Sequence, residues 1–306
     1  MIESYLRSLN IHSLKLLNGF HNRVYEGVYD NRPIVIRVSE RRCRKAIEEE
    51  VRVLNHIKKK VSVGEPWRVG GNTVHTHQDK TLAFFKKAEG LNWHQVTMDA
   101  STHFHAGKTL GMLHKTMQEL SDVKRESYYE HPDLKLLQGV NPVYDKVLEN
   151  LLGNLESHRE TPRTYGLIHG DYLFSNLLYR KDGLTVIDFD DMEYGYYLYD
   201  IAVYLFYLLL GGDPSSIDLE PNKEVFRHFM RGYRETFPTA QLDFTMIQSL
   251  FRLRQLKLLA TIKRTMAPSN LGPWQKAYIA LCDEQFHHDQ AFVGIDYQSL
   301  YERMDT

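Results

Sequence analysis

The sequence predicts an α+β protein of two lobes, and three observations support this prediction. Strand-like segments separated by short turns run from Leu14 to Phe85, around one amphipathic helix at Arg41–Lys60. Helical patterns dominate the rest of the chain. A pair of short strands joined by a turn, Leu177–Ile187, interrupts them. We therefore expect a small N-terminal lobe of antiparallel sheet with one main helix, residues 1–88, and a larger, mainly helical lobe with β-hairpins, residues 89–306.

Composition excludes several classes of protein. The chain has 306 residues, of which 42% are hydrophobic and 25% charged, and a formal net charge of −1. A chain so close to neutral has no overall positive potential that would attract nucleic acid or an anionic membrane surface. No apolar run reaches the ~18 residues of a membrane span, and MIESYLRSLN is no signal peptide. Two cysteines provide no disulfide framework, so we expect a cytoplasmic protein.

Polar residues concentrate in the stretch Leu167–Asp191, among apolar segments. The dipeptide Asp182-Gly183 between two apolar runs is a strong hairpin signal. This hairpin would fold Asp188 back towards the loop that carries Asp171 and Asn176. The strands expected here are residues 166–168, 177–179 and 184–187.

Two aspartates and an asparagine in a small space indicate a bound cation. Carboxylates at close range repel, so one must be protonated or a cation must lie between them. The oxygens of Asn176 and Asp188 suit Mg²⁺, which takes few protein ligands and is otherwise held by phosphates. Asp171, five residues earlier, can orient and deprotonate a hydroxyl. This spacing is the kinase arrangement of a base, a metal-binding amide and a metal-binding carboxylate.

The same residues resemble a known family. HGDYLFSN followed by IDFDDMEYGYYLYDIA is similar to the paired signature of the aminoglycoside phosphotransferase, choline kinase and homoserine kinase type II superfamily. The resemblance implies a protein-kinase-like fold and ATP- and Mg²⁺-dependent phosphorylation of a small-molecule hydroxyl. We expect His169 to shape the loop rather than to react. Asp200, before the apolar helix 201–210, is expected to cap that helix or to brace the catalytic loop.

Two charged residues of the N-terminal lobe are candidates for phosphate binding. Protein kinases place a lysine on the third strand to hold the α- and β-phosphates and to pair with a helix glutamate. The resemblance implies that role for Arg37. Its partner follows from helix geometry, because Glu50 falls on the apolar stripe of its helix, between Leu54 and Ile57. A carboxylate on a buried stripe requires a partner, and Arg37 is the natural one.

Further nucleotide contacts follow from order along the chain. The loop Asn18–Asn22 takes the place of the superfamily's phosphate-covering loop, and Asn22 is its candidate binding residue. Only one glycine is present there, so a plain hairpin turn is the other interpretation. The resemblance places the adenine-binding link between lobes at Lys86 and Ala88, with Gly90 ending the connection.

The acceptor pocket is expected among C-terminal helices. We expect helices at 99–120, 142–155, 221–237, 244–266 and 273–292. The fourth carries a row of cations: Arg252, Arg254, Lys257, Lys263 and Arg264. They would form either a wall suited to an anionic acceptor or an ordinary solvated face. Asp190, Asp191 and Glu193 could line this pocket, help hold a second Mg²⁺, or form a solvated turn.

Two other functions are compatible with the motifs. A serine/threonine protein kinase of the same superfamily is one, although IDFDD replaces the expected DFG and no APE follows. A non-catalytic nucleotide-binding protein with a kinase-like cleft is the other, although all three catalytic positions are filled. The partner we expect is a small-molecule hydroxyl acceptor, without nucleic acid or membrane. The sequence leaves four questions open: which acceptor is used, whether ATP or GTP is the donor, whether one or two Mg²⁺ ions bind, and what the oligomeric state is.

Overall fold

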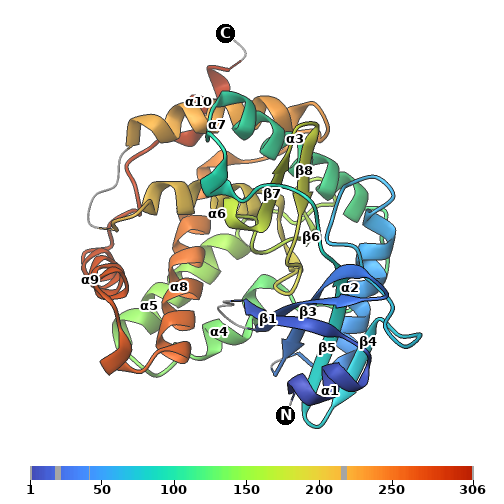
Figure 1. The fold of residues 1–306 in the computed structure, drawn as a ribbon. Coiled ribbons are helices and arrows are strands. Elements are labelled where there is room, and N and C mark those ends of the chain that lie inside the picture. Colours follow the sequence, from blue (N-terminus) through green and yellow to red (C-terminus); the bar gives the residue numbers. More distant parts are fainter. Residues whose placement is uncertain (1, 18–21, 41, 215–218, 305–306) are drawn as a thin grey trace. The chain divides into compact units, whose positions relative to one another are not determined.

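The computed structural model describes residues 2–17, 22–40, 42–214 and 219–304, which divide into two compact units (Figure 1). Unit 1 comprises residues 1–96, 119–125 and 175–190. Unit 2 comprises residues 97–118, 126–174 and 191–306. The boundary predicted between residues 88 and 89 separates a nucleotide-binding lobe from a catalytic lobe. This division by function stays a prediction. In terms of contacts, the segment 175–190 belongs with the N-terminal unit.

Unit 1 is built on an antiparallel sheet of five strands in the order β1-β2-β3-β5-β4, counted over the described residues. Alternate residues of β3 and β5, including Ile34, Ile36 and Phe84, enter one apolar core. Arg37 stands opposite Val24 on one side and Ala83 on the other. The elements are α1 Ile2–Ser8, β1 His12–Leu17, β2 Arg23–Tyr29, β3 Arg32–Ser39, α2 Arg44–Ile57, β4 Val74–His77, β5 Lys80–Lys86, η1 Trp93–Gln95, β7 Leu177–Arg180 and β8 Gly183–Val186.

A tight turn joins the second and third strands of this sheet. Asp30 and Asn31 alone connect β2 to β3, with φ of 49° and 57°, and β3 begins at Arg32. Two residues of positive φ match the twist of a tight two-residue hairpin. The turn expected at Asn18-Gly19 lies outside the described residues.

Helix α2 carries the predicted amphipathic face. Ile47, Leu54 and Ile57 are buried together with Glu50. The helix lies against β4 and β5 of the sheet (Figure 1). It begins at Arg44, three residues later than expected. The burial of Glu50 among apolar neighbours confirms its predicted position on the stripe.

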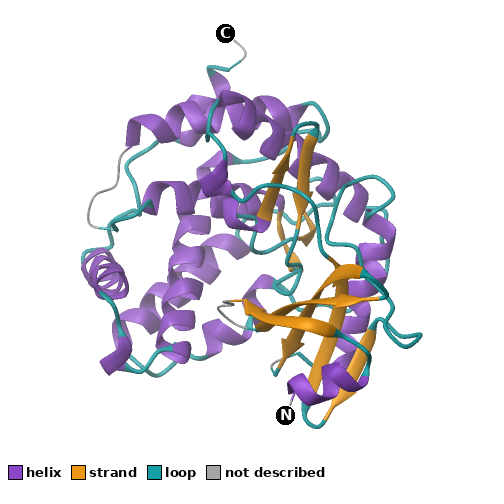
Figure 2. Cartoon of the chain, viewed as in Figure 1, coloured by secondary structure: helices purple, strands orange, loops and turns teal. Residues whose placement is uncertain are grey.

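Unit 2 is mainly helical, as predicted (Figure 2). Its only described sheet pairs β6 with β9. None of its described helices, nor any in unit 1, is long and apolar enough to cross a membrane. The elements are α3 Ala100–Met117, η2 Tyr128–Glu130, α4 Pro132–Lys135, α5 Pro142–Glu156, β6 Tyr165–Ile168, β9 Glu193–Tyr196, α6 Tyr197–Leu210, α7 Leu219–Arg234, η4 Phe244–Met246, α8 Ile247–Thr265, η5 Pro268–Asn270, α9 Pro273–His287 and α10 Tyr297–Glu302. One further element, η3 Phe174–Asn176, has its first residue in unit 2 and its other two in unit 1.

Two glycines allow α3 and α7 to pack closely. A Cβ on Gly232 would lie 1.9 Å from the carbonyl oxygen of Phe104, and one on Gly107 would lie 1.9 Å from that of Phe229. Backbone atoms cannot move aside as flexible side chains can. The two helices would therefore have to separate if either glycine were replaced.

We expect Gly232→Ala to lower the free energy of unfolding by about 1–3 kcal/mol, the usual cost of overpacking. Urea denaturation would measure the change. Gly153→Ala on α5 is the matched control, because nothing lies within 4 Å of its Cβ position. The control should be neutral or slightly stabilising, since alanine favours helix over glycine. Equal stability of the two variants would contradict the close approach.

Candidate active site

The β7–β8 hairpin of unit 1 brings two predicted metal ligands to the same end. Lys181 and Asp182 form its two-residue loop, and Leu177 pairs with Val186 at the open end. Just beyond this pair, the amide of Ile187 donates to the carbonyl of Asn176 at 3.0 Å. Asp188 is the next residue. Its φ of 63° turns the chain sharply, and its side chain is half exposed.

Arg37 of β3 is buried among carboxylates. Its guanidinium makes two contacts with Glu50 of α2, one of them 3.0 Å between Nη1 and Oε1. Nη1 also lies 3.4 Å from Oδ1 of Asp188, and Nη2 lies 3.7 Å from Asp190. Burial alone lowers the pKa of Arg37, but Glu50, Asp190 and Asp188 together raise it well above its ordinary value. The predicted ion pair with Glu50 is present, and it extends to the hairpin.

Asp190 has an internal role in unit 1. It is 5% exposed, and its Oδ2 accepts from the side chain of Asn22 at 3.1 Å. Burial would raise the pKa of Asp190, but Arg37 and Arg42 lower it below the ordinary value. The solvated acidic turn considered from sequence is therefore wrong for this residue. Asn22, a predicted nucleotide contact, lies beside this charged cluster.

Arg125 belongs to the same cluster and was missed by sequence reasoning. Its Nη1 donates to the carbonyl of Asp190 at 3.2 Å, and its Nη2 lies 3.8 Å from Oε2 of Glu50. The side chain is 1% exposed, and burial lowers its pKa. It comes from a segment without a motif, so only its three-dimensional contacts reveal it.

The predicted adenine-binding segment lies beside β7. Lys86 ends β5, and its amide donates to the carbonyl of Glu65 at 2.8 Å. Ala88 follows in the loop. Three residues later, Leu91 and Tyr179 exchange two backbone hydrogen bonds of 2.8 Å each. The segment is thereby tied to the hairpin that carries Asn176 and Asp188. Adenine binding by Lys86 and Ala88 stays a prediction.

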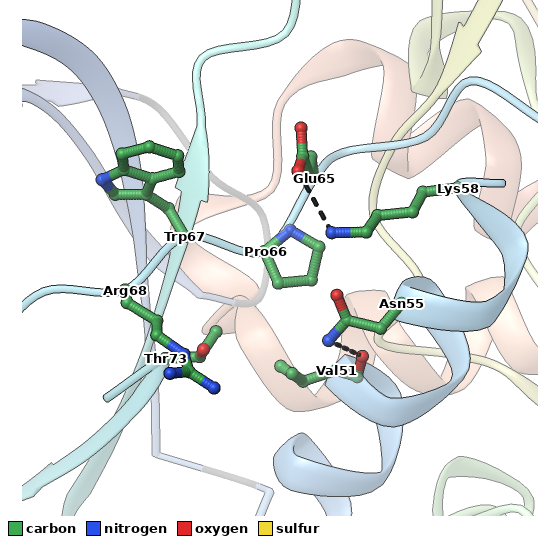
Figure 3. A pocket seen from close by; sticks show the side chains of 8 residues that line it. All are labelled: Val51, Asn55, Lys58, Glu65, Pro66, Trp67, Arg68 and Thr73. Carbon is green, nitrogen blue, oxygen red and sulfur yellow. Dashed lines mark hydrogen bonds and ion pairs between the residues drawn. The ribbon is translucent and has the colours of Figure 1, made fainter. Parts of the chain in front are cut away.

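A separate hollow of about 610 Å³ lies in unit 1 between α2 and the segment 65–68 (Figure 3). Two of its polar groups already have partners: Lys58 binds Glu65 at 3.1 Å, and Asn55 donates to the carbonyl of Val51. None of its lining residues is a predicted site residue. The hollow is therefore no part of the charged cluster.

In unit 2, Asp200 braces the loop that carries Asp171. Its carboxylate accepts the amides of His169 and Gly170, both at 2.8 Å. It also lies 3.0 Å from Nε2 of His114, which burial keeps at a lowered pKa. Asp200 lies in the first turn of α6, which begins at Tyr197. The predicted helix cap is wrong, and the predicted brace is confirmed.

Gly170 gives this loop its shape. Its φ is +79°, and a Cβ there would lie 2.1 Å from the carbonyl oxygen of Asp191. The following amide, that of Asp171, donates to Nδ1 of His169 at 3.3 Å. His169 is fully buried, so it shapes the loop as expected.

Helix α8 faces this loop with a charged stripe. Nη2 of Arg254 lies 2.6 Å from Oδ1 of Asp171, and Lys257 lies 2.5 Å from Glu193. Further along, Arg264 lies 3.2 Å from Asp133. The expected solvated face is wrong for Arg254 and Lys257, which are 11% and 5% exposed. Each of the three cations is matched by an acid.

The described residues contain no group of three or more His, Cys, Asp or Glu side chains that could hold a metal ion. Asp188 and Asn176 form a smaller set of one carboxylate and one amide. Mg²⁺ binds proteins through one or two carboxylates and completes its shell with water and phosphate. The residues present therefore fit a magnesium ion that arrives with a nucleotide.

Comparison with known proteins identifies the family and the fold of the chain. The model of the phosphotransferase enzyme family matches residues 13–241. An amicoumacin kinase from Bacillus subtilis is 24% identical over 307 residues, covering 94% of this chain and 90% of that protein. The structure of an amicoumacin kinase in complex with AMP-PNP, Ca²⁺ and Ami has a TM-score of 0.86 at 21% identity, covering 98% of this chain and 96% of the other. A microcompartment-associated aminopropanol kinase has a TM-score of 0.73 at 22% identity, covering 95% and 98%.

The motifs, the fold and these relatives define a small-molecule kinase. The chain belongs to the phosphotransferase enzyme family. The resemblance seen in its sequence and the predicted α+β kinase-like fold are confirmed. The roles of individual site residues stay predictions.

Proposed function

We propose that this enzyme transfers the γ-phosphoryl group of ATP, with Mg²⁺, to a hydroxyl of a small molecule that also carries an amine. The observation that carries the proposal is the position of Arg37, which is fixed by Glu50 and lies 3.4 Å from Asp188. A candidate phosphate-binding cation and a candidate metal ligand are thus in contact within unit 1. Phosphoryl transfer needs little more from a protein than such positioning and charge neutralisation.

The nucleotide roles fall to residues of unit 1. Arg37 would bind the α- and β-phosphates, with Glu50 holding its guanidinium. Asn176 and Asp188 would hold Mg²⁺, which when bound neutralises charge on the β- and γ-phosphates. Asn22 would contact phosphate, and the backbone of Lys86 and Ala88 would bind adenine. Residues 1–88 would form the nucleotide-binding lobe, supplemented by the hairpin.

The acceptor role falls to unit 2. Asp171 would accept or align the proton of the attacking hydroxyl, and it lies five residues before Asn176 in the chain. This spacing limits the distance between their Cα atoms to about 18 Å. Residues 89–306 would thus supply the base and the acceptor pocket. A cytoplasmic location, where ATP is available, stays part of the proposal.

The charges of α8 bear on the class of acceptor. A wall of uncompensated cations would attract a carboxylate or phosphate. Arg254, Lys257 and Arg264 are instead neutralised by acidic side chains. An uncharged or amine-bearing alcohol suits such a surface better. The solved relatives include an aminopropanol kinase and an aminoglycoside phosphotransferase, which are named for amine-bearing substrates.

Thermal shift and transfer assays test the proposal. ATP with Mg²⁺ should stabilise the protein more than ATP with EDTA, and GTP with Mg²⁺ shows whether adenine is selected. Amicoumacin, 1-amino-2-propanol, spectinomycin, hygromycin B and a serine peptide are then offered as acceptors. At least one small molecule should gain one phosphoryl group by mass spectrometry. Failure of ATP to stabilise the protein, or transfer to the peptide alone, would contradict the proposal.

Asp188→Asn is the matched variant for the metal. Asparagine tolerates the positive φ of this position, so the turn should persist. Loss of the carboxylate should remove the Mg²⁺-dependent part of the thermal shift. An unchanged Mg²⁺ response would exclude Asp188 as a ligand.

A further inference from the structure

We propose that Arg254 of α8 is a positioning residue, which fixes the carboxylate of Asp171 in the orientation needed to receive the acceptor hydroxyl. The inference rests on the proposed function, because it takes Asp171 as the group that meets the acceptor. Its basis is the 2.6 Å contact between Nη2 of Arg254 and Oδ1 of Asp171. The two residues are 83 positions apart in the chain.

Arg254 is itself held in place. Its guanidinium carbon lies 4.9 Å from the centre of the Tyr207 ring, and Nη2 also donates to the hydroxyl of Tyr207. The side chain is only 11% exposed. Although burial lowers the pKa of Arg254, Tyr207 and Asp171 raise it well above its ordinary value. The permanently charged, planar guanidinium of Arg254 thus contacts both the Tyr207 ring and the Asp171 carboxylate.

The rest of the stripe anchors α8. Lys257 is 5% exposed and pairs with Glu193, which is 3% exposed. The hydroxyl of Thr261 donates to Asp133 at 2.9 Å, and Arg264 contacts the same carboxylate. Positions 254, 257, 261 and 264 recur on one face of a helix. Contacts along this face restrain the helix against rotation, and therefore restrain the guanidinium of Arg254.

Such restraint matters because the proposed base acts through geometry. A carboxylate on a loop can rotate about its own bonds, whereas a charge-assisted hydrogen bond from Arg254 to Oδ1 restricts that rotation. Misplacement of a catalytic group by 1 Å can cost about 10²-fold in rate. Asp200 fixes the backbone of the loop through His169 and Gly170, and Arg254 fixes the side chain.

Arg254→Ala tests the inference, assayed with ATP, Mg²⁺ and the four small acceptors named above. We expect kcat to fall roughly 10- to 100-fold. The KM for ATP and the ATP-dependent thermal shift should stay near the wild-type values, because the proposed nucleotide contacts lie in unit 1. Millimolar methylguanidinium should restore part of kcat by filling the space left. The same additive should not restore Asp171→Asn. A merely structural role for Arg254 predicts none of this rescue.

Two further variants decide the matter if Arg254→Ala does not fold. Arg254→Lys keeps the charge without the planar fork, and Tyr207→Phe removes only the hydroxyl that holds the guanidinium. Both should lower kcat below the wild-type value and leave the KM for ATP unchanged. Lys263→Ala is the control on the same helix, since Lys263 is exposed and lies over Tyr144. It should retain full activity.

The outcomes separate the inference from the proposed function. Wild-type kcat in Arg254→Ala, or in both Arg254→Lys and Tyr207→Phe, would overturn the inference and leave the function intact. A fall in kcat accompanied by an equal loss of ATP binding would also overturn it, because the substitution would then have disturbed the whole enzyme and not Asp171 alone. A wild-type protein that phosphorylates none of the acceptors would overturn both.

Discussion

Asp171→Asn should lower kcat for phosphate transfer by about 10²–10⁴-fold, the range that positioned acid–base groups contribute. Asparagine has nearly the shape of aspartate, and its side-chain oxygen can still accept from Arg254. The loop should therefore keep its conformation. The amide cannot take a proton from an attacking hydroxyl, so the chemistry should be lost while the fold remains.

Binding of ATP should be unchanged in this variant. The residues proposed to hold the nucleotide and its metal, including Arg37, Asn176 and Asp188, lie in unit 1, whereas Asp171 lies in unit 2. Release of ADP measures turnover, and the Mg²⁺-ATP thermal shift measures binding. Asp182→Asn is the control, because Asp182 lies at the loop of the β7–β8 hairpin with a side chain 81% exposed. Full turnover by Asp171→Asn would remove Asp171 from its proposed role.

The hairpin around the metal ligands could be predicted because its determinants are local. The Asp182-Gly183 signal and two flanking apolar runs specify a two-residue turn, and register then follows residue by residue. The partner of β6 could not be predicted in this way. β6 pairs with β9, which starts 25 residues after β6 ends, beyond the whole hairpin. No turn signal specifies a pairing across so long a connection.

The pairing of Arg37 with Glu50 could be predicted because burial leaves few choices. A carboxylate on an apolar helix face needs a partner, and the neighbouring strand offers an arginine. Arg125 and Asp190 could not be placed by the same argument. Arg125 lies in a short segment without periodicity, and Asp190 lies in a run of acids that resembles a solvated turn. Only the folded chain shows that Arg125 is buried beside Glu50 and that Asp190 is buried beside Arg37.

The orientation of α8 was ambiguous for a physical reason. Apolar residues occupy most faces of this helix, with Leu250, Leu253, Leu256 and Leu259 among those buried. Because so little of the helix surface is left to solvent, its cations cannot all lie on one solvent-exposed face. A signal was present, since positions 254, 257, 261 and 264 follow helical spacing within an otherwise apolar helix. Polar residues in such a setting must be paired inside the protein, and the acids 171, 193 and 133 supply the partners.

Glu50→Ala should have the largest effect on stability, a loss of about 3–5 kcal/mol in the free energy of unfolding. Glu50 is 1% exposed and compensates Arg37 and, at 3.8 Å, Arg125. Without it, two buried guanidinium groups lose a shared counter-charge. Breaking a buried pair is costly because the remaining charge has been taken out of water. Urea unfolding of the variant measures the loss.

The same change should weaken ATP binding. Arg37 also lies 3.4 Å from Asp188 and 3.7 Å from Asp190, so a guanidinium released by Glu50 is free to pair fully with these acids. It would then occupy the carboxylate that we assign to Mg²⁺. The Mg²⁺-ATP thermal shift of the folded variant should therefore be smaller than that of the wild type.

Glu48→Gln is the control for both measurements. Glu48 lies two positions earlier on the same helix, is 47% exposed in its side chain and pairs with Arg44 at 2.7 Å. Exposed pairs of this kind contribute about 0–1 kcal/mol, because water screens them. A control as unstable as Glu50→Ala would mean that α2 responds to any loss of charge. Wild-type stability in Glu50→Ala would mean that Arg37 is held by Asp188 and Asp190 alone, and that the buried helix carboxylate is dispensable to the nucleotide-binding unit.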